Sequence, residues 1–297
     1  MSHFIGIEAG GTKFVVAHGP DGLHLSDRHV IATTTPDETM AQVLDYISQI
    51  QREHTVSAIG AGVFGPLDPD PSSPHYGHIT TTPKKAWQQF NFVGFLQEAT
   101  GLPIGFDTDV NAAALGEHRW GAAQGLSDFV YITVGTGIGG GAMVNGKLLH
   151  GAMHTEMGHM LMPQDLAKDP FEGVCPFHHN CLEGLASGPA MMKRWHVESA
   201  LDLPADHVAW ALESDYLAAA AANYTFCLSP KRIIFGGGVM NHPGLIEKIC
   251  PKTLQAIAGY VKNATVTEGI NDYIVLPGLG DNAGIAGAIA LAEGSLG

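Results

Sequence analysis

Apolar residues fall along this chain in short runs separated by glycine-rich turns and longer amphipathic stretches. Runs rich in β-branched residues are typical of buried strands. We expect strands at 4–8, 13–18, 23–32, 58–65, 102–107, 129–134, 232–238 and 273–281. We expect helices at 36–54, 92–99, from Asn111 onward, 188–195, 212–228, 243–260 and 282–292. Strands and helices that alternate in this way predict an α/β protein.

The helix at 36–54 shows the pattern most clearly. Met40, Val43, Leu44, Ile47 and Ile50 fall on one face of a helix, as expected for a helix packed on a core. Thr35 with Glu38 forms a capping-box pattern, and Pro36 suits the first helical position. The start and the buried face of this helix are therefore predicted from local sequence alone.

The two halves of the chain open in the same way. Each begins with a strand, a glycine turn, a second strand, a tight turn and a third strand. Gly10 and Gly135 occupy corresponding places with an offset of 125 residues. In the second half AMV meets KLL across Asn145-Gly146, a strong hairpin signal. The repeated order suggests an internal duplication, although the two segments share glycines more than other letters.

Composition narrows the functional classes. The 297 residues carry 29 acidic and 15 basic side chains, a formal net charge of −14, which argues against a nucleic-acid-binding surface. No apolar run approaches the roughly 18 residues of a membrane span, and the N-terminus shows no signal peptide. We expect a cytoplasmic protein with neither membrane nor nucleic acid as a partner. Cys227 and Cys250 lie in apolar helical patterns and are expected to be buried packing residues.

Three glycine turns follow predicted strands, at Gly10–Thr12, Gly135–Gly141 and Gly236–Gly238. Glycine allows backbone N–H groups to converge on an anion, although a tight turn also needs glycine for steric reasons alone. The stretch 135–140 matches G-x-G-x-x-G, but a hairpin follows where a dinucleotide-binding fold requires a helix. The chain has no G-x-x-x-x-G-K-[ST] motif. Phosphate turns set in hairpins favour the actin/hexokinase type of ATP-binding fold.

Six motifs in order make the resemblance specific. They are GIEAGGTKF, DTDVNAAALGE, VGTGIGGG, HTEMGH, CPFHHNCLEG and IIFGGGV, and they span nearly the whole chain. This chain resembles the ROK family of sugar kinases and repressors. TTTPKKAW (80–87) with a Cys-x-x-His-x-x-Cys loop resembles the zinc-containing bacterial fructokinase branch. The resemblance implies a two-lobed, actin-like (ribonuclease H-like) α/β fold, with ATP and sugar meeting in a cleft between the lobes.

The expected lobes follow from that resemblance. Residues 1–120 would form an N-terminal α/β lobe, on which the last helix (282–293) packs back. Residues 121–281 would form a C-terminal α/β lobe with an inserted zinc loop at 159–183. Asp281 and Asn282, which start the last helix, are expected to serve only as caps.

A carboxylate is needed to accept the proton of the sugar hydroxyl. Asp109 follows the strand LPIGFD, and strand C-terminal ends are where α/β sites form. Asp107, two residues earlier on the same strand face, competes on spacing alone, and Asp109 could also be a helix cap. The resemblance implies that the base is Asp109, in the sequence Thr108-Asp109-Val110-Asn111, where Thr108 replaces the family's usual Asn.

The resemblance also assigns binding roles. Sugar contacts are expected from Gly65, Thr108, Asp109, Glu156, His159 and Glu183. Mg²⁺ and ATP contacts are expected from Glu8, Gly10, Gly11, Thr12, Lys13, Gly135, Thr136, Gly137, Gly236, Gly237 and Gly238. On spacing alone, Glu8 could also be a strand-end carboxylate on a solvated turn, and Lys13 could simply flank the turn.

Cys175 and Cys181 lie among histidines in a chain without a secretory signal, which favours metal binding over a disulfide. His159, Cys175, His178 and Cys181 form a plausible tetrahedral zinc set, with His179 and His154 as alternative ligands. Four protein ligands leave no open position, so such a zinc would be structural and would pin the loop 159–183. His159 could bind zinc with one ring nitrogen and a sugar hydroxyl with the other.

The sequence therefore predicts an ATP-dependent hexose kinase, with fructose as the first substrate to test and fructose 6-phosphate as the product. Mannose, glucose and N-acetylmannosamine remain open, because selectivity depends on a few hydroxyl contacts. A sugar-responsive regulator is the non-enzymatic alternative, disfavoured because the first strand begins near Phe4 and no basic patch is evident. A zinc hydrolase is disfavoured by the four-ligand loop. A homodimer is the family default.

Overall fold

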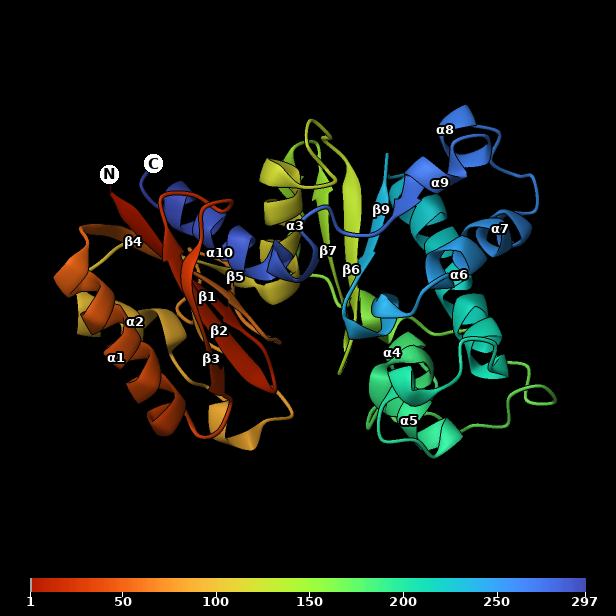
Figure 1. The fold of residues 1–297 in the computed structure, drawn as a ribbon, viewed down its shortest axis with the longest axis horizontal. Coiled ribbons are helices and arrows are strands. Elements are labelled where there is room, and N and C mark those ends of the chain that lie inside the picture. Colours follow the sequence, from red (N-terminus) through yellow and green to blue (C-terminus); the bar gives the residue numbers. More distant parts are fainter. Residues whose placement is uncertain (1) are drawn as a thin grey trace. The chain divides into compact units, whose positions relative to one another are not determined.

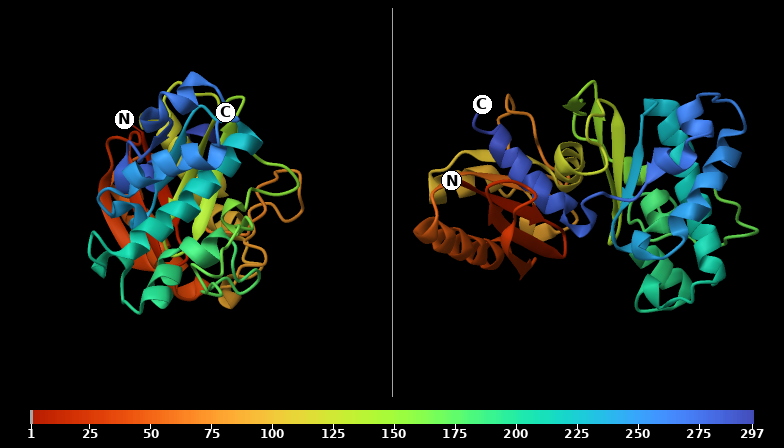
Figure 2. Two further views of the ribbon diagram at one scale, coloured as in Figure 1. Left: turned by 90° about the vertical axis from the view of Figure 1, so that its right-hand side faces the viewer. Right: turned by 45° about the horizontal axis from the view of Figure 1, so that its top comes forward.

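The computed structural model describes residues 2–297, which form two compact units. The first unit contains the chain up to Gly125, together with Leu148–Thr155 and Asp281–Gly297. The second contains Leu126–Lys147 and Glu156–Gly280. The segment Leu148–Thr155, which the sequence assigned to the second lobe, thus packs with the first unit, and the division falls a few residues after the expected position 120. Figures 1 and 2 show the course of the chain.

The strands are β1 (His3–Ala9), β2 (Lys13–Gly19), β3 (Ser26–Ala32), β4 (Val56–Val63), β5 (Ile104–Thr108), β6 (Phe129–Val134), β7 (Ile138–Val144), β8 (Lys147–Leu148), β9 (Ile233–Gly236) and β10 (Ile274–Val275). The α-helices are α1 (Pro36–Glu53), α2 (Phe92–Thr100), α3 (Asp109–Trp120), α4 (Leu182–Ala186), α5 (Gly188–Trp195), α6 (Val208–Leu228), α7 (Leu245–Ile257), α8 (Ala264–Thr267), α9 (Ile270–Tyr273) and α10 (Ala283–Gly294).

The first unit is built on a mixed sheet with the strand order β3-β2-β1-β4-β5. Strands β1, β4 and β5 run parallel, and the β1–β2 and β2–β3 pairs are antiparallel. Helices α1 and α2 cover one face, and α10 covers the other (Figure 1). As its apolar periodicity predicts, α1 buries Met40, Val43, Ile47 and Ile50 in the core of this unit. Thr35 caps α1 by accepting a hydrogen bond from the Glu38 N–H.

Helix α10 lies unusually close to the first sheet, because glycines line its path. A methyl group added at Gly60 would lie 1.7 Å from the Ala288 carbonyl oxygen, and one added at Gly105 would lie 2.0 Å from the Leu291 carbonyl oxygen. Only glycine permits this approach of helix backbone to strand. The last helix is therefore an integral part of the first unit.

The second unit has a mixed sheet with the strand order β10-β9-β6-β7-β8. The long helix α6 packs beside α7 (Figure 1). The Asn145-Gly146 turn joins β7 to β8 as the sequence predicts, with positive φ at both residues. The final predicted strand, 273–281, is reduced to the two residues of β10.

The two sheets have one topology. Adding five to each strand number of the first sheet reproduces the order of the second, read from the other end. In each sheet a hairpin carries the first glycine turn, and a parallel strand follows on the other side. The predicted duplication is thus visible in the strand order, although the two segments have few identical residues.

Several boundaries differ from the sequence prediction. Helix α3 begins at Asp109, two residues earlier than expected, and α6 begins at Val208 rather than near 212. The short helices α4, α8 and α9 lack enough turns to show a helical period and were not predicted. Asn282 stands at the N-cap of α10 but makes no side-chain capping bond. Within residues 2–297, no helix is long and apolar enough to cross a membrane.

Candidate functional site

Acidic and polar side chains gather where the parallel strands of the first sheet end. Glu8 lies near the end of β1, and Asp107 and Thr108 end β5. The register aligns Glu8 with Gly62 of β4, and Gly62 with Asp107 of β5. The carboxyl ends of parallel strands are the usual place for ligands in α/β sheets. The candidate catalytic groups of the first unit therefore lie at one edge of its sheet.

Asp109 is the first residue of α3, and Thr108 is its cap. The Thr108 hydroxyl accepts a hydrogen bond from the Asn111 N–H at 3.1 Å. The Asp109 carboxylate accepts one from the Val110 N–H at 2.9 Å. A negative charge at a helix N-terminus is stabilised by the exposed backbone N–H groups. The capping role considered for Asp109 thus belongs to Thr108, and Asp109 is the first residue of the helix.

Asp107 and Asp109, the two competing carboxylates, have different partners. Asp107 is buried and bonds the His150 ring nitrogen Nε2 at 2.9 Å and the Asn111 side-chain amide at 2.8 Å. Only backbone N–H groups of the described residues donate to the Asp109 carboxylate. Asp107 ends a strand, whereas Asp109 has entered the helix, so the two do not share a strand face. Asp107 is therefore held by two side chains, whereas Asp109 has no side-chain donor among the described residues.

Burial makes the carboxyl groups of Glu8 and Asp109 easier to protonate. It raises the pKa of Glu8 to about 7, and the nearby negative charge of Asp109 adds to the effect. Burial also raises the pKa of Asp109, against the opposing influence of the Val110 N–H and His154. A general base works best when its pKa lies near the working pH. Perturbed carboxyls of this kind are typical of functional sites.

Two histidines near this edge were not assigned to it from the sequence. His150 pairs with Asp107 as described, and His154 accepts a hydrogen bond from the Leu67 N–H at 3.1 Å. Leu67 follows the cis Gly65-Pro66 bond, which lies two residues after the end of β4. The motif HTEMGH placed His154 next to the metal loop in sequence. The structure places it in the first unit instead, so it is not a member of the metal cluster.

The first glycine turn joins β1 to β2. The Gly10 N–H donates to the Lys13 carbonyl at 3.0 Å, while Thr12 and Lys13 are exposed. A methyl group added at Gly11 would lie 3.2 Å from the Lys84 Cε. Lys84, which the sequence showed only as part of TTTPKKAW, thus brings a second cation to this turn. The turn can offer backbone N–H groups and two lysines to an anion.

The other two glycine turns come together at one edge of the second sheet. Thr133 pairs with Gly236, so the ends of β6 and β9 are level. Gly237 has a φ of +91°, and a methyl group there would lie 2.5 Å from the Val134 carbonyl oxygen. The Gly188 N–H, at the start of α5, donates to the Gly135 carbonyl at 2.8 Å. The predicted nucleotide-binding glycines of this unit are therefore neighbours, although they lie about a hundred residues apart in sequence.

The two predicted sugar-binding glutamates differ in their surroundings. Glu183 lies in α4 and is partly buried, and its Oε2 accepts a hydrogen bond from the Ile138 N–H at 3.0 Å. This bond ties α4 to the start of β7, beside the second glycine turn. Glu156 is exposed and immediately precedes the short 3₁₀ turn Met157–His159.

The four predicted zinc ligands His159, Cys175, His178 and Cys181 meet in the second unit, and their ligand atoms lie within 4.8 Å of one another. The His159 Nδ1 lies 3.8 Å from the Cys175 Sγ and 3.6 Å from the Cys181 Sγ, and the His178 Nδ1 lies 3.7 Å from the Cys175 Sγ. Tetrahedral zinc, with its usual Zn–S and Zn–N distances, needs about 3.6 Å between such atoms. The two-thiol, two-imidazole donor set thus fits zinc. His179 lies outside the cluster.

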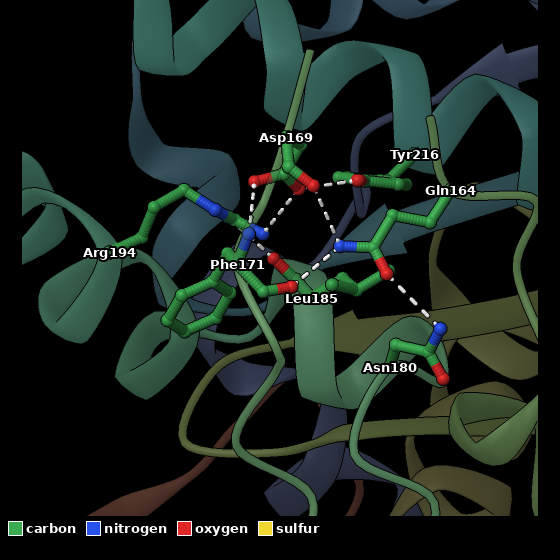
Figure 3. Close-up of polar contacts among 7 residues, drawn as sticks. All are labelled: Gln164, Asp169, Phe171, Asn180, Leu185, Arg194 and Tyr216. Carbon is green, nitrogen blue, oxygen red and sulfur yellow. Dashed lines mark hydrogen bonds and ion pairs between the residues drawn. The ribbon is translucent and has the colours of Figure 1, made fainter. Parts of the chain in front are cut away.

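The loop that carries these ligands is also fastened by a buried polar cluster (Figure 3). Arg194 of α5 bonds the Asp169 carboxylate at 3.1 Å and the Leu185 carbonyl at 2.8 Å. Tyr216 of α6 donates to the same carboxylate, and Gln164 bonds the Phe171 carbonyl. The Asp169 and Arg194 side chains are only 4% and 7% exposed. Breaking a buried ion pair on one side is strongly destabilising, so this cluster holds the middle of the loop independently of any metal.

This buried polar cluster could not be predicted from the sequence, because its members come from the loop and two different helices.

The cysteines outside the loop also differ from one another. Cys250 is buried, as expected, whereas Cys227 is exposed on α6, contrary to the expectation that it packs in the core.

The chain matches the family model described as "ROK family" over residues 4–295. It is 44% identical to a fructokinase of Pediococcus pentosaceus, over 98% of this chain and 97% of that protein. It is 42% identical to a fructokinase of Zymomonas mobilis, over 96% of this chain and 95% of that protein.

Solved structures show the same likeness. A ROK hexokinase from Thermus thermophilus superposes with a TM-score of 0.77 at 28% identity, with 99% of each chain covered. A ROK glucokinase from Streptomyces griseus, solved with glucose and AMPPNP, superposes with a TM-score of 0.75 at 23% identity and covers 99% of this chain. The fold of the chain is accordingly the actin-like ATPase fold that the glycine hairpins predicted.

Proposed function

The chain belongs to the ROK family, and on that premise we propose that it is an ATP-dependent hexose kinase that converts fructose to fructose 6-phosphate. Relatives named fructokinase match it at 37–44% identity over almost the whole chain. Relatives named glucokinase match it at 28–31% identity. The difference supports fructose over glucose as the acceptor.

The observation that carries the reaction type is the environment of Asp109. Its carboxylate stands at a helix N-terminus, has only backbone donors among the described residues and has a raised pKa. In the proposed step it accepts the proton of the sugar 6-hydroxyl. The hydroxyl oxygen forms a bond to the γ-phosphorus of ATP, the bond from that phosphorus to the β–γ bridging oxygen breaks, and ADP leaves. Asp109 holds the proton until it is released to solvent.

Residues near Asp109 are proposed to orient the sugar. In the first unit, Thr108 is the last residue of β5, and Gly65 follows the neighbouring strand β4. From the second unit, Glu156, His159 and Glu183 are proposed to bond sugar hydroxyls. Glu183 already uses Oε2 for the Ile138 N–H, so its other oxygen is the one proposed for a hydroxyl. Orientation of this kind is worth a large factor in rate, because a displaced acceptor cannot approach the phosphoryl group in line.

ATP is proposed to bind through the three glycine turns. Gly10, Gly11, Thr12 and Lys13 would contact phosphate in the first unit, and Gly135, Thr136 and Gly137 in the second, while Gly236, Gly237 and Gly238 would contact adenosine. Glu8 suits Mg²⁺, because its Oε2 is buried with no hydrogen-bond partner in the described part of the chain. A cation beside it would ionise a carboxyl whose pKa is otherwise about 7. When bound, Mg²⁺ neutralises phosphate charge.

Zinc in the loop is proposed to be structural. His159, Cys175, His178 and Cys181 would fill all four positions, and the ends of this loop carry Glu156 and Glu183. With zinc on the Nδ1 atom, His159 keeps Nε2 free for a sugar hydroxyl. The zinc would therefore order the sugar-binding residues and take no part in the chemistry. The homodimer expected from the family stays a prediction.

The proposal is tested by ADP release from the purified chain with Mg-ATP and fructose, glucose, mannose or N-acetylmannosamine. We expect kcat/KM to be highest for fructose, by at least about tenfold, and the product to show phosphorus coupled to carbon 6 in NMR spectra. A higher kcat/KM for another hexose would reassign the substrate. Phosphate on another carbon would overturn the proposed acceptor atom, and no ADP release with any sugar would favour the regulator.

A further inference from the structure

Three histidines from three elements meet in the first unit. His3 begins β1, His18 lies near the end of β2, and His54 follows the last residue of α1. The Nδ1 atoms of His3 and His18 are 2.9 Å apart. The ring of His3 stacks on that of His54 at a centroid distance of 4.2 Å, and the rings of His18 and His54 are 4.9 Å apart. One ring nitrogen from each residue lies within 4.8 Å of the other two.

This three-histidine cluster is far from the kinase groups of the same unit. His3 opens β1, whereas Glu8 is five residues further along the same strand. At about 3.3 Å per residue, the two lie roughly 17 Å apart along the strand. The cluster sits at the edge where β1 and β4 begin, opposite the edge where they end in the candidate active site. A ligand bound at this cluster would therefore not touch the groups proposed for phosphoryl transfer.

We propose that His3, His18 and His54 form a second zinc site, bound through one ring nitrogen from each residue and a water molecule in the fourth position. Neutral imidazole is a preferred ligand of zinc, and three imidazoles with one open position are a known type of zinc coordination. Tetrahedral zinc requires about 3.3 Å between its nitrogen ligands. The 2.9 Å separation of the His3 and His18 Nδ1 atoms needs to open by a few tenths of an ångström. The His54 ring, stacked on His3 with an angle of 10° between the ring planes, needs to turn so that its nitrogen faces the same point.

The second nitrogen of His18 supports a ligand role. His18 is 2% exposed, and its Nε2 points to the Asp27 carboxylate at 3.5 Å. That distance is at the outer limit of a hydrogen bond, and no closer partner reaches the Nε2 atom in the described part of the chain. Histidines that bind metal commonly donate their other N–H to a carboxylate, which fixes the ring and its tautomer. Asp27 is the group in this position.

The local backbone supports the same conclusion. Asp27 has a φ of +49°, in the left-handed region that residues other than glycine seldom occupy. The pairing of β2 with β3 shifts register between Val16 and His18, next to the cluster. Such irregularities re-aim side chains and often adjoin functional sites. Together they place Asp27 beside His18.

The competing explanation is purely structural. One neutral histidine can donate to the other across 2.9 Å, and stacked rings can simply cover the end of the sheet. In that case the three histidines would bind no zinc at the Zn²⁺ concentration that fills the four-ligand site of the loop. The number of zinc ions per chain separates the two explanations, and it does so without any measurement of kinase activity.

The experiment uses the untagged full chain, since a histidine tag would itself bind zinc. The protein is equilibrated with a small excess of Zn²⁺, passed through a desalting column and analysed for zinc by mass spectrometry. We expect two zinc ions per chain for the wild type and one for His54→Gln, which changes one of the two partly exposed members of the cluster. His24→Gln, an exposed histidine of the same unit that lies outside the cluster, should keep two.

Cobalt substitution identifies which site is lost. The loop contains two thiolates and should show a sulfur-to-cobalt charge-transfer band, whereas the three-histidine cluster should not. His54→Gln should keep this band and lose the metal ion of the three-histidine cluster. His178→Gln should weaken the band and keep the metal ion of the three-histidine cluster. His3→Gln serves in place of His54→Gln if circular dichroism shows that the latter misfolds. One zinc ion in the wild type, or two in both cluster variants, would overturn the proposal.

Discussion

The two sheets have the same strand order but carry different chemistry at the ends of their parallel strands. In the first sheet, Glu8 lies near the end of β1, Asp107 lies near the end of β5, and Asp109 directly follows β5. In the second, Gly135 directly follows β6, and Gly236 ends β9 and is followed by Gly237 and Gly238. One topology thus presents carboxylates in the first unit and uncharged backbone N–H groups in the second. The comparison shows that the fold sets where a functional group stands, and that the residues at the strand ends set what it can do.

The comparison predicts that proton transfer depends on the first unit alone. Asp109→Asn should lower kcat by about 10³-fold, within the range of roughly 10²–10⁴ for loss of a general base. The KM for fructose should change little, because the amide keeps the size and the Val110 contact. Steady-state kinetics measure both values. Asp45→Asn, an exposed carboxylate of α1, is the matched control, and near-normal turnover in Asp109→Asn would require a different base.

The raised pKa values of the first unit predict an acid limb in the pH–rate profile. A base must be ionised, so activity should fall as pH drops through its pKa. Burial raises the pKa of Asp109, and that of Glu8 to about 7. We expect kcat/KM to fall about tenfold per pH unit on the acid side, or about 100-fold over two units.

Glu8→Gln is the companion measurement, and its remaining acid limb should lie at lower pH than that of the wild type. Two changes produce this shift: the Glu8 carboxyl no longer titrates, and its charge no longer acts on Asp109. An unchanged limb in Glu8→Gln would assign the whole acid limb to other groups. A profile that is flat between about pH 5 and 8 would contradict a required Glu8 carboxylate whose pKa is about 7.

The loop of the second unit should affect sugar binding more than turnover. His178→Gln should raise the KM for fructose by about tenfold and reduce zinc content, because it removes one exposed ligand. The effect should stay moderate, since Asp169 and Arg194 still hold the loop. His179→Gln changes the exposed neighbour that lies outside the cluster and should leave both values unchanged. Equal effects of the two variants would remove His178 from the metal set.

The smallest effect is expected from Glu213, a fully buried carboxyl of α6 in the second unit. Burial raises the pKa of Glu213 well above 4.5, and neither oxygen has a hydrogen-bond partner among residues 2–297. The unfolded state ionises at lower pH than the folded state, so stability is lost as pH rises. Glu213→Gln should therefore add about 1 kcal/mol to the free energy of unfolding at pH 8, where the amide offsets part of the gain.

At about pH 4 the same substitution should have almost no effect, because the carboxyl is then neutral in both states. Urea unfolding at the two pH values measures the difference, and kcat should stay at the wild-type value. A loss of stability at pH 8 would mean that Glu213 is ionised in the folded state, where the positive charge of Arg194 favours the ionised form. Such a result would give the second unit a second buried carboxylate besides Asp169.

Local sequence determined much of this protein. The strands and the helix α1 follow from apolar periodicity, and the Asn145-Gly146 hairpin follows from turn chemistry, because these features depend on residues a few positions apart. The Cys-x-x-His-x-x-Cys spacing likewise placed three candidate ligands on one loop. The motif order pointed to the family and to Asp109. The short helices and exact element ends were missed, because four or five residues do not reveal a period.

Tertiary structure alone decided which distant residues meet. His150 bonds Asp107, Arg194 bonds Asp169, and the last helix returns to lie against Gly60. His3, His18 and His54 look like scattered histidines in the sequence and become a cluster only when two strands and a helix end converge. Hydrophobic periodicity specifies which face of an element is buried, but the partner across the contact depends on strand order and register, which no local pattern records.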